Sequence, residues 1–212
     1  MKNEELSLTG SIKFAWEKVT KNLGFFIPLA IIYFALTGID WTAQKTDTTI
    51  PAISIIQYLL NIVMAVGITY ISLQTIKGEK TKIEDLFIHS QYFLRFLLGS
   101  ILYGLIVVLG LLLLVVPGIV WGLKYSFISY IFVDKDMSIA DAFRKSAEIT
   151  AGKKLTMIAF YIMLFGVLIL GALALGVGLL IAVPVTWVAG AHFYRQLEKL
   201  KEKSPQESKI VS

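Results

Sequence analysis

The chain has 212 residues, of which 56% are hydrophobic and 17% are charged. A soluble domain contains about 45–50% apolar and roughly 25% charged residues, so this composition fits a lipid bilayer better than a water-facing surface. The sequence has no Cys, which excludes disulfides, thiolate zinc sites and cysteine nucleophiles. With only two His, a histidine-rich metal centre is also excluded, and we expect no cofactor.

The first 21 residues contain Glu4, Glu5 and Glu17 among their lysines and have no continuous apolar core. They lack the features of a signal peptide, so we expect the first apolar run to remain in the mature protein. Apolar residues recur in this segment at helical spacing, with lysines around them, which predicts a short amphipathic helix at the membrane surface. The predicted apolar face contains Ile12, Ala15, Trp16, Val19 and Leu23.

Long uncharged runs after this segment predict six transmembrane helices. A helix needs about 20 apolar residues to cross a hydrocarbon core of roughly 30 Å. Lipid cannot satisfy peptide N–H and C=O groups, so each run must be helical, and none shows the alternation of a barrel strand. We expect a turn between the last two spans near Gly171 to Gly178. The spans are predicted at about residues 23–40, 51–76, 96–116, 117–133, 155–175 and 178–197.

The fold class expected from these runs is all-α. Residues 1–200 should form a single integral membrane domain, a polytopic bundle of six transmembrane helices in three hairpins. Residues 201–212 are rich in charged side chains and are predicted to form a disordered cytoplasmic tail.

The basic residues are distributed unevenly between the two sides of such a bundle. If the chain crosses six times, 18 of the 20 Lys and Arg residues lie in segments on one side, while Lys45 lies on the other and Lys124 lies within the fourth span. The positive-inside rule then predicts a protein of the cell membrane with both termini on the cytoplasmic side. The net charge of +5 predicts a basic face beside anionic lipid of the cytoplasmic leaflet, and we expect no nucleic-acid partner.

Two cytoplasmic connections resemble each other. Four residues of the first connection match residues 56 positions later in the second: Ile83, Asp85, Phe87 and Ser90. In each connection a hydroxyl residue precedes an acidic residue by three positions, which is the spacing of a capping box that opens a helix. These pairs are Thr81 with Glu84 and Ser138 with Asp141. We therefore expect three units, each a short interfacial amphipathic helix followed by a transmembrane hairpin.

The amphipathic segments allow two interpretations. They are connectors lying in the headgroup layer, or they form a surface that binds anionic lipid or another membrane protein. The candidate residues of that surface are Lys13, Lys18, Lys82, Arg144, Lys145, Lys153 and Lys154.

A longer pattern covers roughly the third to fifth spans. It contains Val115-Val116-Pro117-Gly118-Ile119, Lys124-Tyr125, Tyr130, Asp134, Ile139, Ala142, Arg144, Lys145, Ser146, Glu148, Thr150 and Gly152, and Pro184, Phe193, Tyr194 and Leu197 close it. This pattern resembles the membrane domain joined to some bacterial glycerophosphodiester phosphodiesterases, and it is similar to related stand-alone six-helix membrane proteins. The resemblance implies six spans with cytoplasmic termini and no catalytic activity, because the phosphodiesterase barrel is absent.

Polar residues within the predicted spans are the remaining clues to function. Lys124 lies about one third of the way along the fourth span, where a charge costs about 3 kcal/mol on insertion scales. It is either a substrate or counter-ion contact inside the bundle, or a lysine that extends to the outer headgroups. Gln57 and Asn61 share a face one turn apart and are either partners of Lys124 or interhelical hydrogen-bonding residues.

Small residues also recur at helix-packing spacing and indicate close helix contacts. The pairs are Ser100 with Gly104, Ala172 with Gly176, and Ala174 with Gly178.

These observations favour a non-enzymatic membrane protein that binds lipid or a partner. The alternative is a transporter of small solutes or lipids, with a polar intramembrane site around Lys124. Buried acidic residues, which coupled transporters usually need, are scarce in the spans. A membrane enzyme is the weakest hypothesis, because it requires His192, Asp134 and Asp141 to converge.

Overall fold

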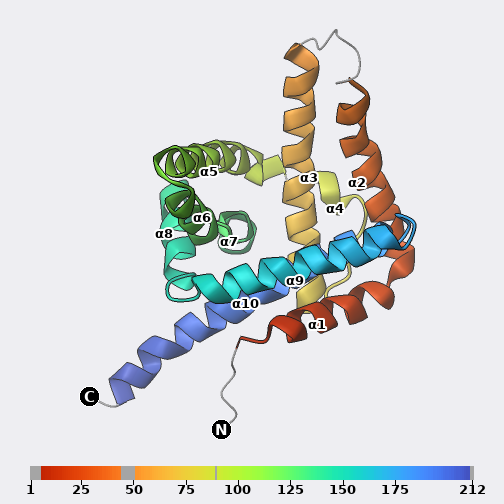
Figure 1. Ribbon diagram of the computed structural model, residues 1–212. Helices are drawn as coiled ribbons and strands as arrows, with labels where there is room; N and C mark the ends of the chain where they lie inside the picture. Colours follow the sequence, from red (N-terminus) through yellow and green to blue (C-terminus); the bar gives the residue numbers. More distant parts are fainter. Residues whose placement is uncertain (1–5, 44–50, 89, 211–212) are drawn as a thin grey trace.

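The computed structural model describes residues 6–43, 51–88 and 90–210, with side chains described for residues 6–36, 54–87 and 91–202. Within these ranges the regular structure is entirely helical. The helices cross one another at steep angles, and α10 runs through the middle, packing against α1, α2, α3, α8 and α9 (Figure 1). The helices are α1 (Leu8–Thr20), α2 (Leu23–Ala43), α3 (Pro51–Lys77), α4 (Asp85–Ile88), α5 (Phe93–Leu113), α6 (Val115–Lys124), α7 (Ile128–Lys135), α8 (Ile139–Ile149), α9 (Lys154–Leu173) and α10 (Leu179–Ile210).

The first unit begins with a helix, α1. The Ser7 hydroxyl caps α1 by accepting a hydrogen bond from the Gly10 amide at 3.0 Å. The helix buries Ser11, Ala15 and Val19, whereas Trp16 of the predicted apolar face is 53% exposed. The chain then bends by 99° into α2. The buried face of α1 is therefore rotated from the predicted one, because α1 packs on α10.

The second unit does not begin with the capping box and amphipathic helix that the sequence predicts. Thr81 and Glu84 do not form a capping box; instead Asp85 accepts a hydrogen bond from the Lys82 amide at 2.8 Å, and only the short α4 follows. A 3-10 turn then leads into α5 (Figure 1). The reason lies in packing, because Leu86 is buried against Gly67 of α3, so close that a Cβ at Gly67 would lie 2.4 Å from the Leu86 Cα.

The fourth span, predicted as one helix over residues 117–133, is interrupted. The carbonyl of Lys124 accepts hydrogen bonds from Ser146 Oγ at 2.9 Å and Thr150 Oγ1 at 3.1 Å, both on α8. The Phe127 amide donates to Ser146 Oγ at 3.4 Å. These hydroxyls replace helical backbone partners, so α6 ends at Lys124 and α7 starts at Ile128 without Pro or Gly at the break.

The third unit consists of α8 followed by α9 and α10. Ser138 caps α8 by accepting from the Asp141 amide at 3.2 Å, and it also donates to the Asp141 carboxylate at 2.7 Å. The turn between α9 and α10 includes Leu175 and Gly176, both with positive φ. The last helix continues to Ile210, through most of the segment predicted to be disordered, and the Glu and Lys residues of that segment favour helix.

Among the residues that the structure describes, four stretches are long and apolar enough to cross a membrane: Ser54–Lys77, Phe93–Leu113, Val115–Lys135 and Lys154–Leu173. The bent α1–α2 pair would make a fifth. The sequence of α10 from Leu179 to Tyr194 is shorter than the roughly 20 apolar residues that a span needs. The structure thus shows a helical chain with four or five candidate spans, and the count of six stays a prediction.

Consecutive helices pack closely at small residues. Most of these residues are not the ones that the sequence predicted. A Cβ at Gly110 would lie 2.8 Å from the Gly118 Cα, so these two glycines let α5 and α6 touch. At Gly171 a Cβ would lie 2.6 Å from the Ala182 Cβ, where α9 meets α10. Around Gly104, which was expected at such a contact, no atom lies within 4 Å of an added Cβ.

Candidate functional site

A cluster of charged side chains joins the ends of α3 and α7 to the middle of α10. Arg195 on α10 donates to Asp134 near the end of α7, and its other terminal nitrogen donates to Glu198 at 2.7 Å. Lys135 Nζ lies 2.8 Å from Glu198 Oε1, and Lys77 Nζ, at the end of α3, lies 3.7 Å from Asp134 Oδ1. One arginine and two lysines therefore surround two carboxylates.

Both carboxylates of the cluster are nearly inaccessible to water. The Asp134 and Glu198 side chains are each 4% exposed, whereas those of Arg195 and Lys135 are 23% and 33% exposed. A buried carboxylate without a cation beside it is unstable, so removing one partner of such a pair usually costs about 3–5 kcal/mol. The cluster therefore holds α7, α10 and the end of α3 in one arrangement.

The charge state of Glu198 follows from these contacts. Burial alone would raise the pKa of the Glu198 carboxyl, but the hydrogen bonds and charges of Lys135 and Arg195 outweigh it and hold the pKa below its ordinary value of 4.5. Glu198 is thus an anion at neutral pH.

Aromatic rings form a wall along one side of the cluster. Tyr194 donates a hydrogen bond to Asp134 Oδ2 at 3.3 Å and stacks on Tyr130, with ring centroids 5.5 Å apart. Phe193 stacks on Phe160 of α9 at 4.1 Å. A Cβ at Gly190 would lie 2.6 Å from the Tyr130 hydroxyl, so glycine at this position makes room for that ring. These contacts exclude water from one side of the carboxylates.

The N-terminal helix is attached next to this cluster. The Ser7 amide donates to Gln196 Oε1 at 3.0 Å, and Gln196 Nε2 donates to Ser11 Oγ at 3.1 Å. Ser11 Oγ also lies 3.1 Å from His192 Nδ1, and the His192 ring stacks on Phe14 at 4.3 Å. The two ends of the sequence are therefore joined through α1 and α10, as Figure 1 shows.

A cavity of about 410 Å³ opens beside the cluster, between α1, α3, α7 and α10. Its charged lining includes Lys77, Lys135, Arg195 and Lys199, together with Glu198 and Glu202. Most of these cations already lie beside a carboxylate. The lining of the cavity therefore has only a small net positive charge.

The three candidate intramembrane residues do not form one polar site through hydrogen bonds among the described side chains. Gln57 Nε2 donates to the Leu36 carbonyl at 2.9 Å and so links α3 to α2. Asn61 donates to the Gln57 carbonyl at 2.9 Å. Lys124 ends α6, with its ammonium 5.1 Å from the centre of the Tyr125 ring. Lys124 is thus associated with the break of the fourth span, and Gln57 with the α2–α3 contact.

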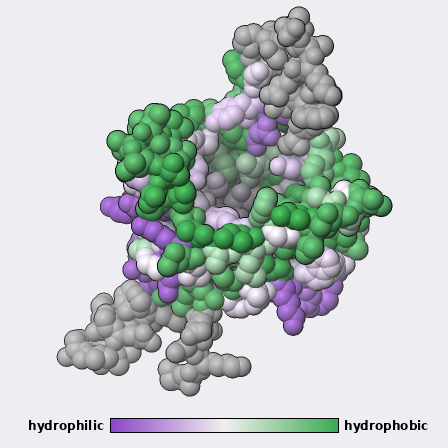
Figure 2. Space-filling model, viewed as in Figure 1, coloured by the Kyte–Doolittle hydropathy of each residue, from purple (hydrophilic) through white to green (hydrophobic). Residues whose placement is uncertain are grey.

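The predicted basic surface is divided between two parts of the molecule. Figure 2 shows hydrophilic patches over α8 and over α1, separated by apolar surface. Arg144 on α8 pairs with Asp141 yet its side chain is 81% exposed, and Lys145 lies 3.6 Å from Glu148. Lys13 and Lys82 are exposed, and the Lys18 ammonium lies 5.4 Å from the centre of the Phe14 ring.

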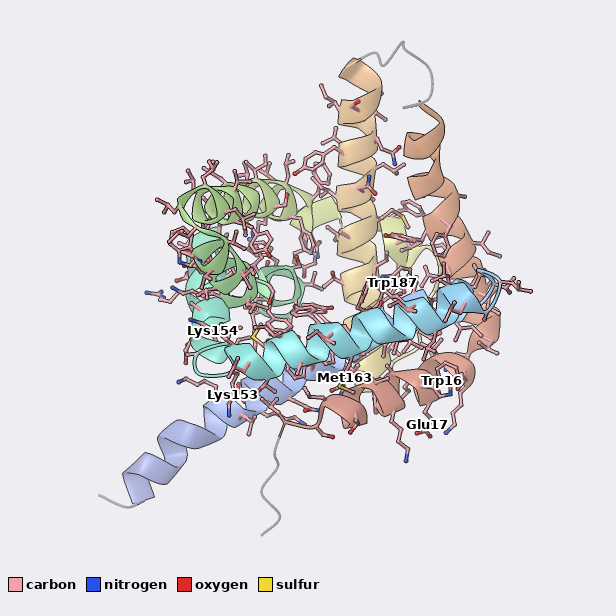
Figure 3. All side chains as sticks on the ribbon, viewed as in Figure 1. Trp16, Glu17, Lys153, Lys154, Met163 and Trp187 are labelled. Atoms are coloured by element: carbon pink, nitrogen blue, oxygen red, sulfur yellow. The ribbon has the colours of Figure 1, made fainter. Side chains whose placement is uncertain are left out.

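Lys153 and Lys154 occupy an unusual position at the start of α9. Both are exposed, and Figure 3 shows them at the junction of α8 and α9. No side chain caps this helix and its first turn has no acidic residue. Because the N-terminus of a helix carries a partial positive charge, two lysines there are unfavourable by about 0.3–1 kcal/mol each. The helix end and the two ammonium groups together attract an anion.

Sequence reasoning missed the ion cluster. In the sequence, Asp134 and Tyr194 belong to the family-like pattern and Arg195 is one of the basic residues of the tail. Nothing in that pattern indicates that they contact one another. The available signal was that acidic residues occur directly at the ends of the fourth and sixth spans, where the positive-inside rule does not require them. His192, Asp134 and Asp141 do not share partners, since they contact Ser11, Arg195 and Ser138 respectively. Among the described residues, no group of three His, Asp or Glu side chains is arranged to hold a metal ion.

Replacing Glu198 by Gln should destabilise the protein and reduce its sensitivity to acid. Arg195 and Lys135 would then share one carboxylate, at a cost of about 2–3 kcal/mol, less than for a fully buried pair because both cations keep some water. Since the Glu198 pKa is lowered in the folded state, its stabilisation is complete above pH 4.5 and is lost as the pH falls through the lowered pKa. Tryptophan fluorescence during thermal unfolding in detergent at neutral and acidic pH measures both effects.

Glu202→Gln is the matched control, because Glu202 is exposed on the same helix. It should change stability by no more than about 0.5 kcal/mol. Equal effects of the two substitutions at neutral pH would show that the cluster does not hold the helix ends together.

Comparison with known proteins covers a little under half of the chain. Residues 101–201 match a family described as "Protein of unknown function (DUF975)". The matched region extends from α5 into α10 and contains the break, α8 and all of the ion cluster except Lys77. No curated protein and no solved structure matches the chain. The comparisons therefore associate the second half of the chain with a family of unknown function and name no ligand.

Proposed function

We propose that this chain is a non-enzymatic integral protein of the cell membrane that binds anionic lipid, or a membrane partner of the same surface charge, through its basic cytoplasmic face. The observation that carries the proposal is the start of α9, where Lys153 and Lys154 are exposed at an uncapped helix N-terminus. Arg144 and Lys145 on the preceding helix add two more cations. Basic residues near an anionic leaflet contribute about 1 kcal/mol each to lipid binding.

The sidedness of the proposal rests on where the helix ends meet. Lys77, Lys135 and Arg195 lie at the ends of the second, fourth and sixth predicted spans, and all three contact the same pair of carboxylates. The positive-inside rule assigns these ends to the cytoplasm. The first turns of α3 lie at the far end of the molecule from α1 (Figure 1). The resemblance of this region to phosphodiesterase-linked membrane domains agrees with six spans and belongs to the same proposal.

Cysteine labelling tests this sidedness. The chain has no Cys, so Thr46→Cys and Ser204→Cys each introduce a single thiol. In intact cells a membrane-impermeant maleimide should modify the variant at position 46 and reach the variant at position 204 only after permeabilisation. Equal modification of both variants before permeabilisation would contradict the proposed topology.

Neutralising the basic surface should reduce the preference for anionic lipid. Arg144, Lys145, Lys153 and Lys154 replaced together by Gln should lower the affinity for phosphatidylglycerol by about tenfold or more, with phosphatidylcholine unaffected. Native mass spectrometry of retained lipid, with thermal stabilisation by added lipid, measures the preference.

A charge-conserving variant is the control for that experiment. Arg144→Lys combined with Lys145, Lys153 and Lys154 each replaced by Arg should bind phosphatidylglycerol like the original protein. Unchanged lipid preference in the neutralised variant would remove this surface from the function.

One observation favours transport as a second candidate function. The fourth span is broken next to Lys124, and interrupted helices with a charged residue at membrane depth occur at transporter binding sites. In proteoliposomes loaded with a panel of anionic solutes, flux should occur and should fall at least tenfold in Lys124→Leu if the ammonium binds substrate. Flux that survives this substitution would exclude Lys124 from the pathway. Lys80→Leu serves as the control, because Lys80 is exposed and lies outside the proposed lipid surface.

A further inference from the structure

An apolar groove separates α1 from the hairpin of α9 and α10. It has a volume of about 690 Å³, within the range of about 300–1,000 Å³ that ligand pockets occupy. Ile12 and Trp16 line it from α1, and Met163, Val167 and Leu170 line it from α9. In Figure 3, Met163 lies on the side of α9 that faces α1, and Trp16 lies on α1. The groove is thus bounded by segments from the two ends of the chain.

Small residues line the floor of the groove and make the groove deep. Gly171, Ala174, Gly178 and Ala182 come from both sides of the α9–α10 turn. Gly171 and Gly178 lie so close that a Cβ at Gly178 would be 2.6 Å from the Gly171 carbonyl oxygen. The two helices therefore touch without side chains between them and leave the space above them open.

The shape of the groove suits an extended hydrocarbon chain. Along α9 its lining extends from Met163 to the end of the helix, a rise of about 15 Å at 1.5 Å per residue. That is about half of a hydrocarbon core of roughly 30 Å, the depth of one leaflet. At this end the turn carries some of the most exposed apolar side chains, including Leu175 at 95%. Such side chains favour lipid over water on that side.

One cation completes the lining. Among the described lining residues Lys13 alone is charged, and it forms no ion pair with a described residue. The nearby Glu17 instead pairs with Lys21 at 2.6 Å. An apolar groove whose lining includes one lysine without an ion-pair partner complements an amphiphile with an anionic head.

We propose that this groove binds one acyl chain of an anionic phospholipid, whose phosphate contacts Lys13. The inference rests on the proposed function in that both require anionic lipid, but it concerns a different part of the chain from the α8–α9 lysines. A bound lipid would fill the space between α1 and the hairpin and strengthen the attachment of α1 to α10.

Photolabelling locates the acyl chain. The full-length protein is reconstituted with phosphatidylglycerol that carries a diazirine in one acyl chain, and labelled peptides are mapped by mass spectrometry. We expect labelling of the groove segments around Ile12, Met163 and Leu170 to exceed that of the exposed apolar face of α5. That face contains Leu105, Leu109 and Leu112 and reports on bulk lipid.

A bulky side chain in the groove tests occupancy. Met163→Trp fills the space and should reduce groove labelling several-fold while leaving α5 labelling unchanged. Ile162→Trp is the matched control, because Ile162 is the adjacent residue, is 66% exposed and does not line the groove. Equal labelling of groove and α5, or groove labelling that Met163→Trp does not change, would overturn the proposal, as would cross-linking of the groove to a second protein copy.

The headgroup contact is tested separately at Lys13. Lys13→Gln should weaken retention of phosphatidylglycerol in the groove about fivefold, and Lys13→Arg should restore it. Phosphatidylcholine with the same diazirine chain should label the groove less than phosphatidylglycerol does. Equal labelling by the two lipids together with no effect of Lys13→Gln would overturn the role of Lys13.

The experiments distinguish failure of the groove proposal from failure of the proposed function. If the α8–α9 variant loses its lipid preference while Met163→Trp has no effect, the groove is not a lipid site and the basic surface is. If groove labelling depends on Met163 and Lys13 while the α8–α9 variant is unchanged, the groove is a lipid site without that surface.

Discussion

Two carboxylates with almost no access to water, Asp134 and Glu198, require cations beside them, and the rest of the structure depends on this pairing. Arg195 contacts both carboxylates, while Lys77 contacts Asp134 and Lys135 contacts Glu198. Because these residues come from the ends of α3 and α7 and from the middle of α10, satisfying the charges fixes where three helices meet. Apolar packing, which tolerates sliding between helices, does not specify such a meeting point so tightly.

The sequence pattern over the third to fifth predicted spans acquires a structural explanation at this cluster. Tyr130 and Tyr194 stack beside Asp134, and Ser146 binds the carbonyl of Lys124 and the amide of Phe127. Each of these side chains satisfies or shields a backbone or charged group that lipid would leave unpaired. The motif therefore describes how a broken span and an ion cluster are held together, and it assigns no catalytic role.

The proposed interactions with lipid lie away from the cluster, on elements that it positions. At the start of α9, exposed lysines add to the positive helix end. Between α1 and the α9–α10 hairpin, an apolar groove carries one unpaired lysine. Both features combine cationic and apolar surface in the way that an anionic phospholipid requires.

The sequence alone determined the helical class, the approximate boundaries of the apolar runs and the cap of α8 at Ser138, because these depend on local hydrophobicity and on contacts within a few residues. It also identified Lys124 and the basic residues of α8 and α9 as unusual. Only the tertiary structure decided that Lys124 ends a helix, that α1 packs on α10, and that Asp134 meets Arg195. Those outcomes depend on partners up to 189 residues apart, and nothing in the local pattern of either partner specifies the other.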